Sequence, residues 1–149
     1  MNLWKKMKSK FRKKIKVFVS LSADGLHHGH LNILIKAKKY GNIIVGLMTD
    51  KAIKSYKKSK PLMKYNDRKK LLSHVDLVSK IIPVHSLNFA QLANKHKLDY
   101  WIHGSDWKKG VQSLARKKLI KEMKKWGGKV IDIPYTKGIS NTIIKKKYK

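Results

Sequence analysis

Three histidines within four residues are the most chemically suggestive feature of this sequence. His27, His28 and His30 surround Gly29 and directly follow a short β-branched run. Gly25 and Gly29 allow the backbone to bend and to approach a ligand closely. A helix that starts here would offer free N–H groups and the positive end of a dipole, and both favour a phosphate. Because His27 and His30 are three residues apart, they can face the same side and donate hydrogen bonds to phosphate oxygens.

Two other interpretations of the histidines compete with phosphate binding. A lone histidine is usually structural, but three of them after a buried strand and at a helix start are harder to explain in that way. The spacing also permits two zinc ligands, yet the chain has no cysteine and no second His-x-His or His-x-x-His pair. The sequence therefore favours phosphate over zinc, and we predict no metal held by side chains.

Acidic residues are rare, so their positions are informative. Asp24, Asp50 and Asp106 are three of only eight, and each follows a predicted strand directly or within a few residues. A contact with ribose, magnesium or an amine is one explanation, and helix capping by Asp is the other. Residues 135–142 combine Gly138 with hydroxyl side chains at a predicted helix start, which indicates either an anion-binding turn or a plain Ser/Thr cap.

The elements that must position these residues alternate along the chain. Apolar, β-branched runs predict strands at residues 15–21, 43–48, 77–84, 100–103 and 129–133. Helical spacing predicts helices at residues 29–40, 66–74, 87–96, 111–126 and 138–147, with Asn66 capping the second. This alternation indicates an α/β protein, a Rossmann-like three-layer α/β/α sandwich with a five-stranded parallel sheet. Ligands of such sheets lie beyond the carboxyl ends of the strands, where the histidines fall.

Length and composition limit the function further. The chain has 149 residues, 42% of them hydrophobic, which suffices for one packed core. The absence of cysteine excludes disulfides and thiol nucleophiles. Neither a P-loop nor a Gly-x-Gly-x-x-Gly motif occurs, and the single glutamate, Glu122, argues against a paired-carboxylate glycosidase. No segment approaches the roughly 20 apolar residues of a membrane span, so we expect a cytoplasmic protein.

The chain is strongly basic, with 37 Lys and Arg against 8 Asp and Glu and a net charge of +29. Such an excess attracts polyanions. The lysines are scattered over every segment, however, as on a solvated surface. We therefore expect weak, salt-sensitive binding to polyanions and no specific nucleic-acid partner.

Residues 1–14 form a basic extension in front of a domain that spans residues 15–149. Leu3, Met7 and Phe11 recur every four residues in it, so a helix there would be amphipathic. We expect this helix to be frayed or packed on the domain. A weak contact with an anionic membrane is the alternative.

Four motifs, in this order, resemble signatures of the HxGH cytidylyltransferase family over about residues 15–147. They are His27-His28-Gly29-His30 for HxGH, Tyr65-Asn66-Asp67-Arg68 for Y-x-x-R, Gly104-Ser105-Asp106-Trp107 for G-D-D-W, and Gly138-Ile139-Ser140-Asn141-Thr142 for GIS(S/T)T. Within the family, residues 22–24, 47–52, 55–57 and 135–138 are most similar to the cytidylyltransferase domain found beside phosphoenolpyruvate mutase in phosphonate synthesis. Glycerol-3-phosphate cytidylyltransferases usually carry Arg in place of Tyr135, and the family often has Gly in place of Ser20.

The resemblance implies a nucleotidyltransferase that transfers CMP from CTP to a phosphonate resembling 2-aminoethylphosphonate and releases pyrophosphate. Phosphocholine, phosphoethanolamine and glycerol 3-phosphate are alternative acceptors, and ATP is a less favoured donor. A non-catalytic polyanion-binding module is an alternative from another class. Because family members commonly dimerise, the resemblance also implies a homodimer, with Mg²⁺ bridging the phosphates as cofactor.

The same resemblance assigns roles to individual residues. The catalytic residues would be His27, His30 and Lys57. Nucleotide binding would involve Ser22, Ala23, Asp24, Gly29, Arg68, Gly104, Asp106, Trp107, Gly138, Ile139, Ser140 and Thr142. The acceptor would be bound by Asp50, Lys51 and Tyr135.

Overall fold

One parallel sheet forms the centre of the molecule in the computed structural model, which describes residues 2–11 and 13–147. Its strand order is β3-β2-β1-β4-β5, and every neighbouring pair is parallel. The strands are β1 (Lys16–Leu21), β2 (Asn42–Met48), β3 (Val78–Val84), β4 (Tyr100–Gly104) and β5 (Lys129–Ile133). The five-stranded parallel sheet was predicted from sequence and is confirmed, with each strand end within one residue of its expected place.

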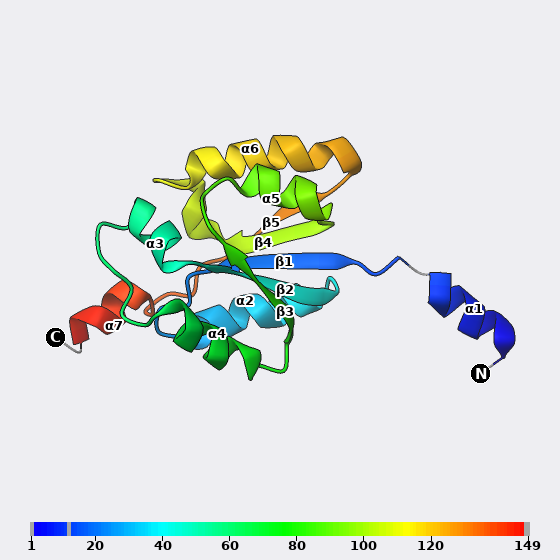
Figure 1. The fold of residues 1–149 in the computed structure, drawn as a ribbon, viewed down its shortest axis with the longest axis horizontal. Helices are drawn as coiled ribbons and strands as arrows, with labels where there is room; N and C mark the ends of the chain where they lie inside the picture. Colours follow the sequence, from blue (N-terminus) through cyan, green and yellow to red (C-terminus); the bar gives the residue numbers. More distant parts are fainter. Residues whose placement is uncertain (1, 12, 148–149) are drawn as a thin grey trace.

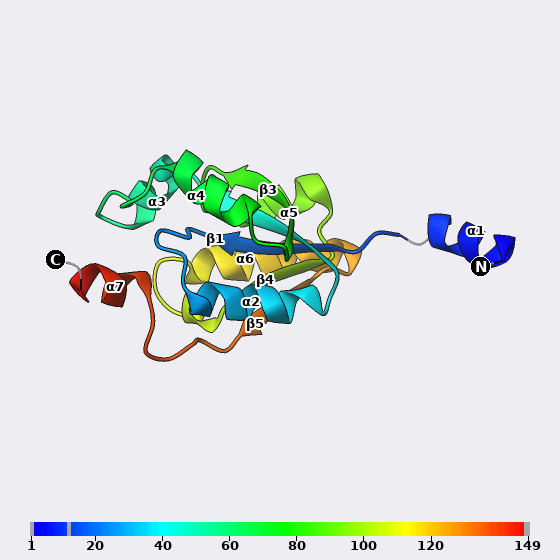
Figure 2. The same cartoon turned by 90° about the horizontal axis from the view of Figure 1, so that it is seen from below.

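Helices cover both faces of the sheet and complete three layers (Figures 1 and 2). On one face lie α2 (His28–Lys38) and α4 (Tyr65–Ser73), which contribute Leu34 and Leu72 to one core. On the other lie α3 (Asp50–Tyr56), α5 (Phe89–His96) and α6 (Ser113–Met123), which contribute Phe89 and Leu119 to a second core. The predicted α/β/α sandwich is therefore confirmed.

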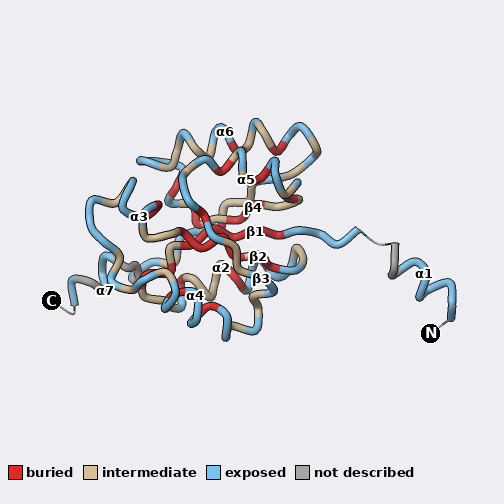
Figure 3. The backbone as a smooth tube through the Cα atoms, viewed as in Figure 1, coloured by how far each residue is buried: buried red, intermediate tan, exposed pale blue. Residues whose placement is uncertain are grey.

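Strand β1 explains how the two cores are separated. Val17 and Val19 belong to the core beneath α2 and α4, whereas Phe18 belongs to the core beneath α5 and α6. This is the alternation expected of a strand buried on both faces, and Figure 3 shows the buried residues following the strands. Gly46 on β2 makes room for Phe18, because a Cβ atom there would lie 2.0 Å from the Phe18 Cζ atom.

Several helix boundaries differ from the expected ones. Helix α3 was not predicted; Thr49 caps it, and its hydroxyl accepts the Ala52 N–H at 3.1 Å. Helix α4 begins at Tyr65, so the prediction that Asn66 caps it is wrong. Two 3₁₀ turns, η1 (Ser105–Lys108) and η2 (Lys124–Trp126), replace an expected loop and the end of a long helix.

The amino-terminal helix α1 (Leu3–Phe11) projects away from the sheet (Figures 1 to 3). Asn2 caps it, since the Asn2 Oδ1 atom accepts the Lys5 N–H at 3.0 Å. The helix does not pack on the domain, because Leu3 is 77% exposed and Trp4 is 66% exposed. Of the two forms that we expected, a frayed or a packed helix, packing on the domain is therefore wrong. No helix within residues 2–11 and 13–147 has the length and apolar character to cross a membrane.

Candidate active site

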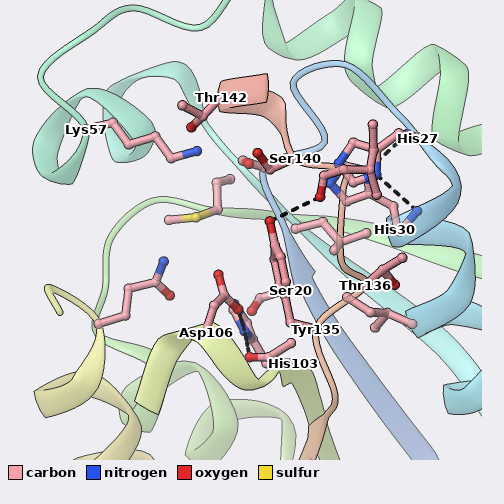
Figure 4. Close-up of a pocket in the computed structure, with 18 of the residues that line it drawn as sticks. Ser20, His27, His30, Lys57, His103, Asp106, Tyr135, Thr136, Ser140 and Thr142 are labelled. Atoms are coloured by element: carbon pink, nitrogen blue, oxygen red, sulfur yellow. Dashed lines mark hydrogen bonds and ion pairs between the residues drawn. The ribbon is translucent and has the colours of Figure 1, made fainter. Parts of the chain in front are cut away.

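A pocket of about 350 Å³ lies beyond the carboxyl ends of β1, β2 and β4, where the parallel sheet predicts a ligand site (Figure 4). Helix α7 (Asn141–Lys147) and the segment before it close one side. The pocket brings together eleven of the residues expected from the sequence, from both ends of the chain. They are Ser22, His27, Gly29, His30, Lys57, Gly104, Asp106, Tyr135, Ile139, Ser140 and Thr142.

The two histidines of the pocket cap helix α2 reciprocally. His27 is the N-cap residue, and its Nδ1 atom accepts the Gly29 N–H at 3.1 Å. The His30 Nδ1 atom accepts the His27 N–H at 3.2 Å. This is the geometry of a capping box, with two imidazoles in place of the usual hydroxyl and carboxylate. The turn thereby fixes both rings, whose centroids lie 3.9 Å apart.

Capping also fixes which nitrogen of each ring carries the proton. Burial, followed by the charge of His28, lowers the pKa of His27. Burial, followed by the charges of His27 and Lys57, lowers the pKa of His30 to about 3. Both rings are therefore neutral at pH 7, and since each Nδ1 accepts a backbone N–H, each proton resides on Nε2. The site holds two Nε2–H donors suited to the oxygens of a phosphate.

Gly29 permits this arrangement, and its substitution is the first test of it. A Cβ atom on residue 29 would lie 2.8 Å from His27 Cε1 and 3.4 Å from Ile139 Cγ2. We expect Gly29→Ala to lower kcat by about tenfold to a hundredfold, because the His27 ring must turn away from its capping position. Steady-state kinetics with a urea unfolding curve would check this. An unchanged kcat in a folded variant would show that the ring position does not matter.

The depressed pKa of His30 predicts a loss of stability in acid. Its folded pKa of about 3 lies below the ordinary value of 6.5, so the unfolded chain takes up the proton first as pH falls. The contribution of the neutral His30 ring to the free energy of unfolding is present in full above about pH 6.5 and is lost as pH falls toward 3. We expect the free energy of unfolding in urea to fall less between about pH 7 and pH 5 in His30→Ala than in the wild type. If the free energy of unfolding fell equally with pH in both proteins, the His30 ring could not be neutral and buried as described.

Cationic and hydroxyl side chains lie near the histidines at the same end of the pocket. Figure 4 shows Lys57, Ser140 and Thr142 there. Ser140 precedes α7, and its Oγ atom accepts the Ile143 N–H at 3.1 Å, which leaves the hydroxyl proton available to a ligand. Tyr135 secures this segment, because its hydroxyl donates to the Ile139 carbonyl at 3.1 Å. This end of the pocket is thus rich in donors and suited to phosphate groups.

The structure places seven of the expected site residues outside the lining of this pocket. They are Ala23, Asp24, Asp50, Lys51, Arg68, Trp107 and Gly138. Lys51 is exposed on α3, and Gly138 has a φ of 81°, which delays the start of α7. Ala23 is buried and has a φ of 50°, an uncommon conformation for a residue with a Cβ atom. Their contacts with substrate stay predictions.

Arg68 and two of the acidic residues organise the loops behind the pocket. The Arg68 side chain is fully buried and donates to the carbonyls of Ser22 at 2.6 Å, Met48 at 2.8 Å and Met63 at 3.0 Å. It also pairs with the Asp50 carboxylate. Asp24 accepts the backbone N–H groups of Leu62 and Met63, both at 2.9 Å. In this structure these side chains hold the carboxyl ends of β1 and β2 in place.

Ser20, Gln112 and His103 are polar residues of the pocket lining that the sequence analysis did not name as site candidates. Ser20 Oγ and Gln112 Oε1 are buried atoms of the pocket lining with no hydrogen-bond partner in the part of the chain that the structure describes. His103 is the third, and its Nδ1 atom lies 2.8 Å from the Gly104 carbonyl. Burial lowers the pKa of His103, so the neutral ring donates from Nδ1 and its Nε2 accepts. Of the three, only Ser20 could have been found from the sequence, because the family often has glycine at its position.

Trp107 lies behind His103 and fixes it. The two rings stack with centroids 4.2 Å apart, and the Trp107 indole N–H donates to Asp132 at 2.6 Å. Arg116 binds the same carboxylate at 2.7 Å. Trp107 therefore supports the pocket wall, and nothing in the sequence pattern linked it to Asp132.

The described residues offer no cluster of three or more His, Asp or Glu side chains that could hold a metal ion. Asp106 is the only carboxylate in the pocket lining within residues 2–11 and 13–147. A magnesium ion that entered with a nucleotide would find its ligands in phosphate oxygens and water, as Mg²⁺ prefers. The residues fit an ion that the substrate carries, with the chain contributing at most one carboxylate.

A Rossmann-like sheet whose HxGH turn faces a donor-rich helix start defines the site of a nucleotidyltransferase, and comparison with known proteins agrees. The cytidylyltransferase-like family model matches residues 22–147. The chain is 36% identical over 135 residues to a glycerol-3-phosphate cytidylyltransferase from Bacillus spizizenii, covering 88% of this chain and 95% of that one. It is 27% identical to the ethanolamine-phosphate cytidylyltransferase of Mus musculus, covering 86% of this chain and 31% of the relative.

A solved structure is also similar over nearly its whole length. The lipopolysaccharide core biosynthesis protein from Thermoplasma volcanium GSS1 superposes with a TM-score of 0.67 at 25% identity, covering 84% of this chain and 98% of that one. The chain belongs to the cytidylyltransferase-like family and is an enzyme of the nucleotidyltransferase class. The resemblance to the phosphonate branch rests on its motifs alone and stays a prediction.

Proposed function

We propose that this enzyme transfers CMP from CTP to a small acceptor that carries a phosphonate or phosphate at one end and an amine at the other. The leading acceptor is 2-aminoethylphosphonate. The observation that carries the proposal is the single pocket in which His27, His30, Lys57 and Ser140 meet at the carboxyl edge of the sheet. Family membership supports the nucleotidyl transfer, and the chemistry of the pocket supports the acceptor class.

The donor-rich end of the pocket suits the reacting phosphates. An oxygen of the acceptor's phosphonate forms a bond to the α-phosphorus of CTP, while the bond from that phosphorus to the β-phosphate oxygen breaks and pyrophosphate leaves. The Nε2–H groups of His27 and His30 donate to the α-phosphate oxygens as their charge rises. Lys57 and the hydroxyl of Ser140 offset the charge of the leaving pyrophosphate. The acceptor oxygen is already anionic, so no side chain must remove a proton.

Magnesium remains the proposed cofactor. When bound to the triphosphate, it would neutralise phosphate charge and so assist departure of pyrophosphate. Its ligands would be phosphate oxygens and water, because the Asp106 carboxylate lies at the other end of the pocket (Figure 4). Lys57 supplies charge from the chain itself.

The other end of the pocket favours an amine. Figure 4 shows Asp106, His103 and Ser20 together there. The Asp106 side chain is 61% exposed, and Gln112 Oε1 has no partner among the described residues. These atoms accept hydrogen bonds, so they complement an ammonium group better than a second anion. An acceptor with opposite charges at its two ends matches this division of the pocket.

Glycerol 3-phosphate is the second candidate acceptor, because it is named in the Bacillus spizizenii relative at 36% identity. Tyr135 argues against it. This residue stands where such enzymes usually carry Arg, it lines the pocket, and it is engaged with Ile139. A phenol carries no positive charge with which to bind the phosphate of glycerol 3-phosphate.

Pyrophosphate release tests the proposal directly. The enzyme is assayed with CTP, ATP, UTP or GTP against 2-aminoethylphosphonate, ethanolamine phosphate, phosphocholine and glycerol 3-phosphate. We expect the highest kcat/KM for CTP with 2-aminoethylphosphonate. Fastest turnover with glycerol 3-phosphate would overturn the amine assignment, and no release with any pair would overturn the transfer reaction itself.

A substitution of Asp106 shows whether this residue binds the acceptor or the nucleotide. In Asp106→Asn the carboxylate charge is lost while the shape is kept. We expect KM for 2-aminoethylphosphonate to rise by about tenfold, with a smaller change for glycerol 3-phosphate at the same CTP concentration. Equal changes for both acceptors would place Asp106 on the nucleotide.

A further inference from the structure

Helix α1 carries an apolar surface that the other residues described by the structure leave exposed. Leu3, Trp4 and Met7 are 77%, 66% and 52% exposed. A helix turns by about 100° per residue, so these three side chains fall within an arc of about 100°. Large apolar side chains grouped on one exposed helix face mark an interaction surface.

Basic residues flank this apolar arc and give the segment a single sign of charge. Residues 1–14 contain seven Lys and Arg and no Asp or Glu. Lys5 and Lys6 fall on the opposite side of the helix, and Lys8 lies at the edge of the arc with its Nζ atom 4.1 Å from the Trp4 ring centroid. A tryptophan and long lysines at the edge of an apolar face are typical of helices that lie in a membrane interface.

The helix is attached at the end of the molecule opposite the active site. Residues 13–15 lead from α1 into β1, whose amino end is held by Asp99. The Lys13 Nζ atom lies 2.8 Å from the Asp99 carboxylate, which also accepts the Lys16 N–H at 2.9 Å. The pocket lies beyond the carboxyl ends of the strands, so a surface bound by α1 would leave the pocket open (Figure 1).

We propose that α1 docks this enzyme on an anionic lipid surface, with Leu3, Trp4 and Met7 entering the headgroup boundary and the lysines binding lipid phosphates. Charge complementarity selects this occupant. Pairing with the same helix of a second copy would bring two segments of seven Lys and Arg without Asp or Glu together, and these would repel each other. A nucleic acid would neutralise the lysines but would leave Leu3 and Met7 in water.

Vesicle flotation tests the proposal with the full chain. Vesicles of phosphatidylcholine alone are compared with vesicles that contain equal parts of phosphatidylcholine and phosphatidylglycerol. We expect binding only to the anionic vesicles, with a blue shift of Trp4 emission that is absent from Trp4→Phe. Trp101 and Trp107 are already buried, and the Trp126 indole N–H is bound to the Leu98 carbonyl at 2.8 Å. Leu3→Gln/Met7→Gln, which leaves the charge unchanged, is expected to weaken binding on the order of tenfold or more.

Two lysine variants distinguish binding through α1 from binding through the basic surface of the domain. Lys5→Gln/Lys6→Gln/Lys8→Gln is matched by Lys117→Gln/Lys118→Gln/Lys121→Gln on α6, where the lysines are also exposed and the net charge changes by the same amount. The α1 variant is expected to lose more vesicle binding than the α6 variant, and each keeps its pyrophosphate release without vesicles. Equal losses, or unchanged binding in Leu3→Gln/Met7→Gln, would overturn the proposal. Binding to duplex DNA in preference to the anionic vesicles would instead assign α1 to nucleic acid.

Discussion

His30→Ala is expected to lower kcat for pyrophosphate release by about a hundredfold to a thousandfold, equivalent to about 2.7–4 kcal/mol of transition-state stabilisation. The His30 Nδ1 atom accepts the His27 N–H, so the ring presents its Nε2–H to the pocket. That donor matters most when the α-phosphate is pentacoordinate and carries additional charge. KM for CTP should therefore change much less than kcat, as for an interaction made in the transition state.

His28 provides a matched control for this experiment. It lies between the two capping histidines in the same turn, but its side chain is exposed and lies outside the pocket lining. His28→Ala should keep kcat within about threefold of the wild type. His27→Asn offers a further comparison, because Asn caps helices well but does not reach as far as the imidazole Nε2. A His30→Ala enzyme as active as His28→Ala would rule out the proposed role of the ring.

The histidine turn could be predicted from sequence because its information is local. A β-branched strand, two glycines and three histidines lie within residues 17–30, and the carboxyl-edge rule for parallel sheets supplies the rest. What the sequence did not contain was the direction of each ring. The Nδ1 hydrogen bonds that turn both Nε2–H groups outward depend on the cap geometry of α2.

The sequence pattern could not indicate pocket residues that lie far along the chain from the motifs. Gln112 is separated by about 80 residues from the histidine turn, and only the folded chain shows that its Oε1 atom is buried in the pocket without a partner among the described residues. Helix α3 escaped for a different reason. It is short, and its buried residues Ala52 and Ile53 are adjacent, which gives no recurring 3.6-residue pattern.

Arg68 shows how a family motif can indicate the right residue without indicating its contacts. The Y-x-x-R pattern implied a side chain that binds nucleotide, whereas the structure buries Arg68 among three carbonyls and Asp50. Ser22 and Met48 line the pocket, so Arg68 shapes it through the two strand ends that those residues terminate. A direct phosphate contact and this indirect role predict different outcomes when the side chain is removed.

Arg68→Met is expected to lower the free energy of unfolding by at least about 3 kcal/mol. It removes this donor from the buried Met48 carbonyl and the partly buried Ser22 carbonyl, and each unpaired buried group costs about 1–3 kcal/mol. Arg68→Lys should lose nearly as much, because a single ammonium cannot reach the partners that the planar guanidinium binds together. Urea unfolding measures both losses, with Lys69→Met on the exposed face of α4 as the control.

The kinetic constants of the folded fraction decide between the two roles of Arg68. If its guanidinium only fixes the strand ends, Arg68→Met and Arg68→Lys should both lower kcat, because Ser22 and Met48 shift in the pocket wall. A direct phosphate contact predicts another pattern: KM for CTP rises strongly in Arg68→Met, recovers in Arg68→Lys as the charge returns, and stability hardly changes in either variant. We expect the first pattern, because a fully buried side chain with all its hydrogen bonds to protein groups cannot turn toward a ligand without breaking them.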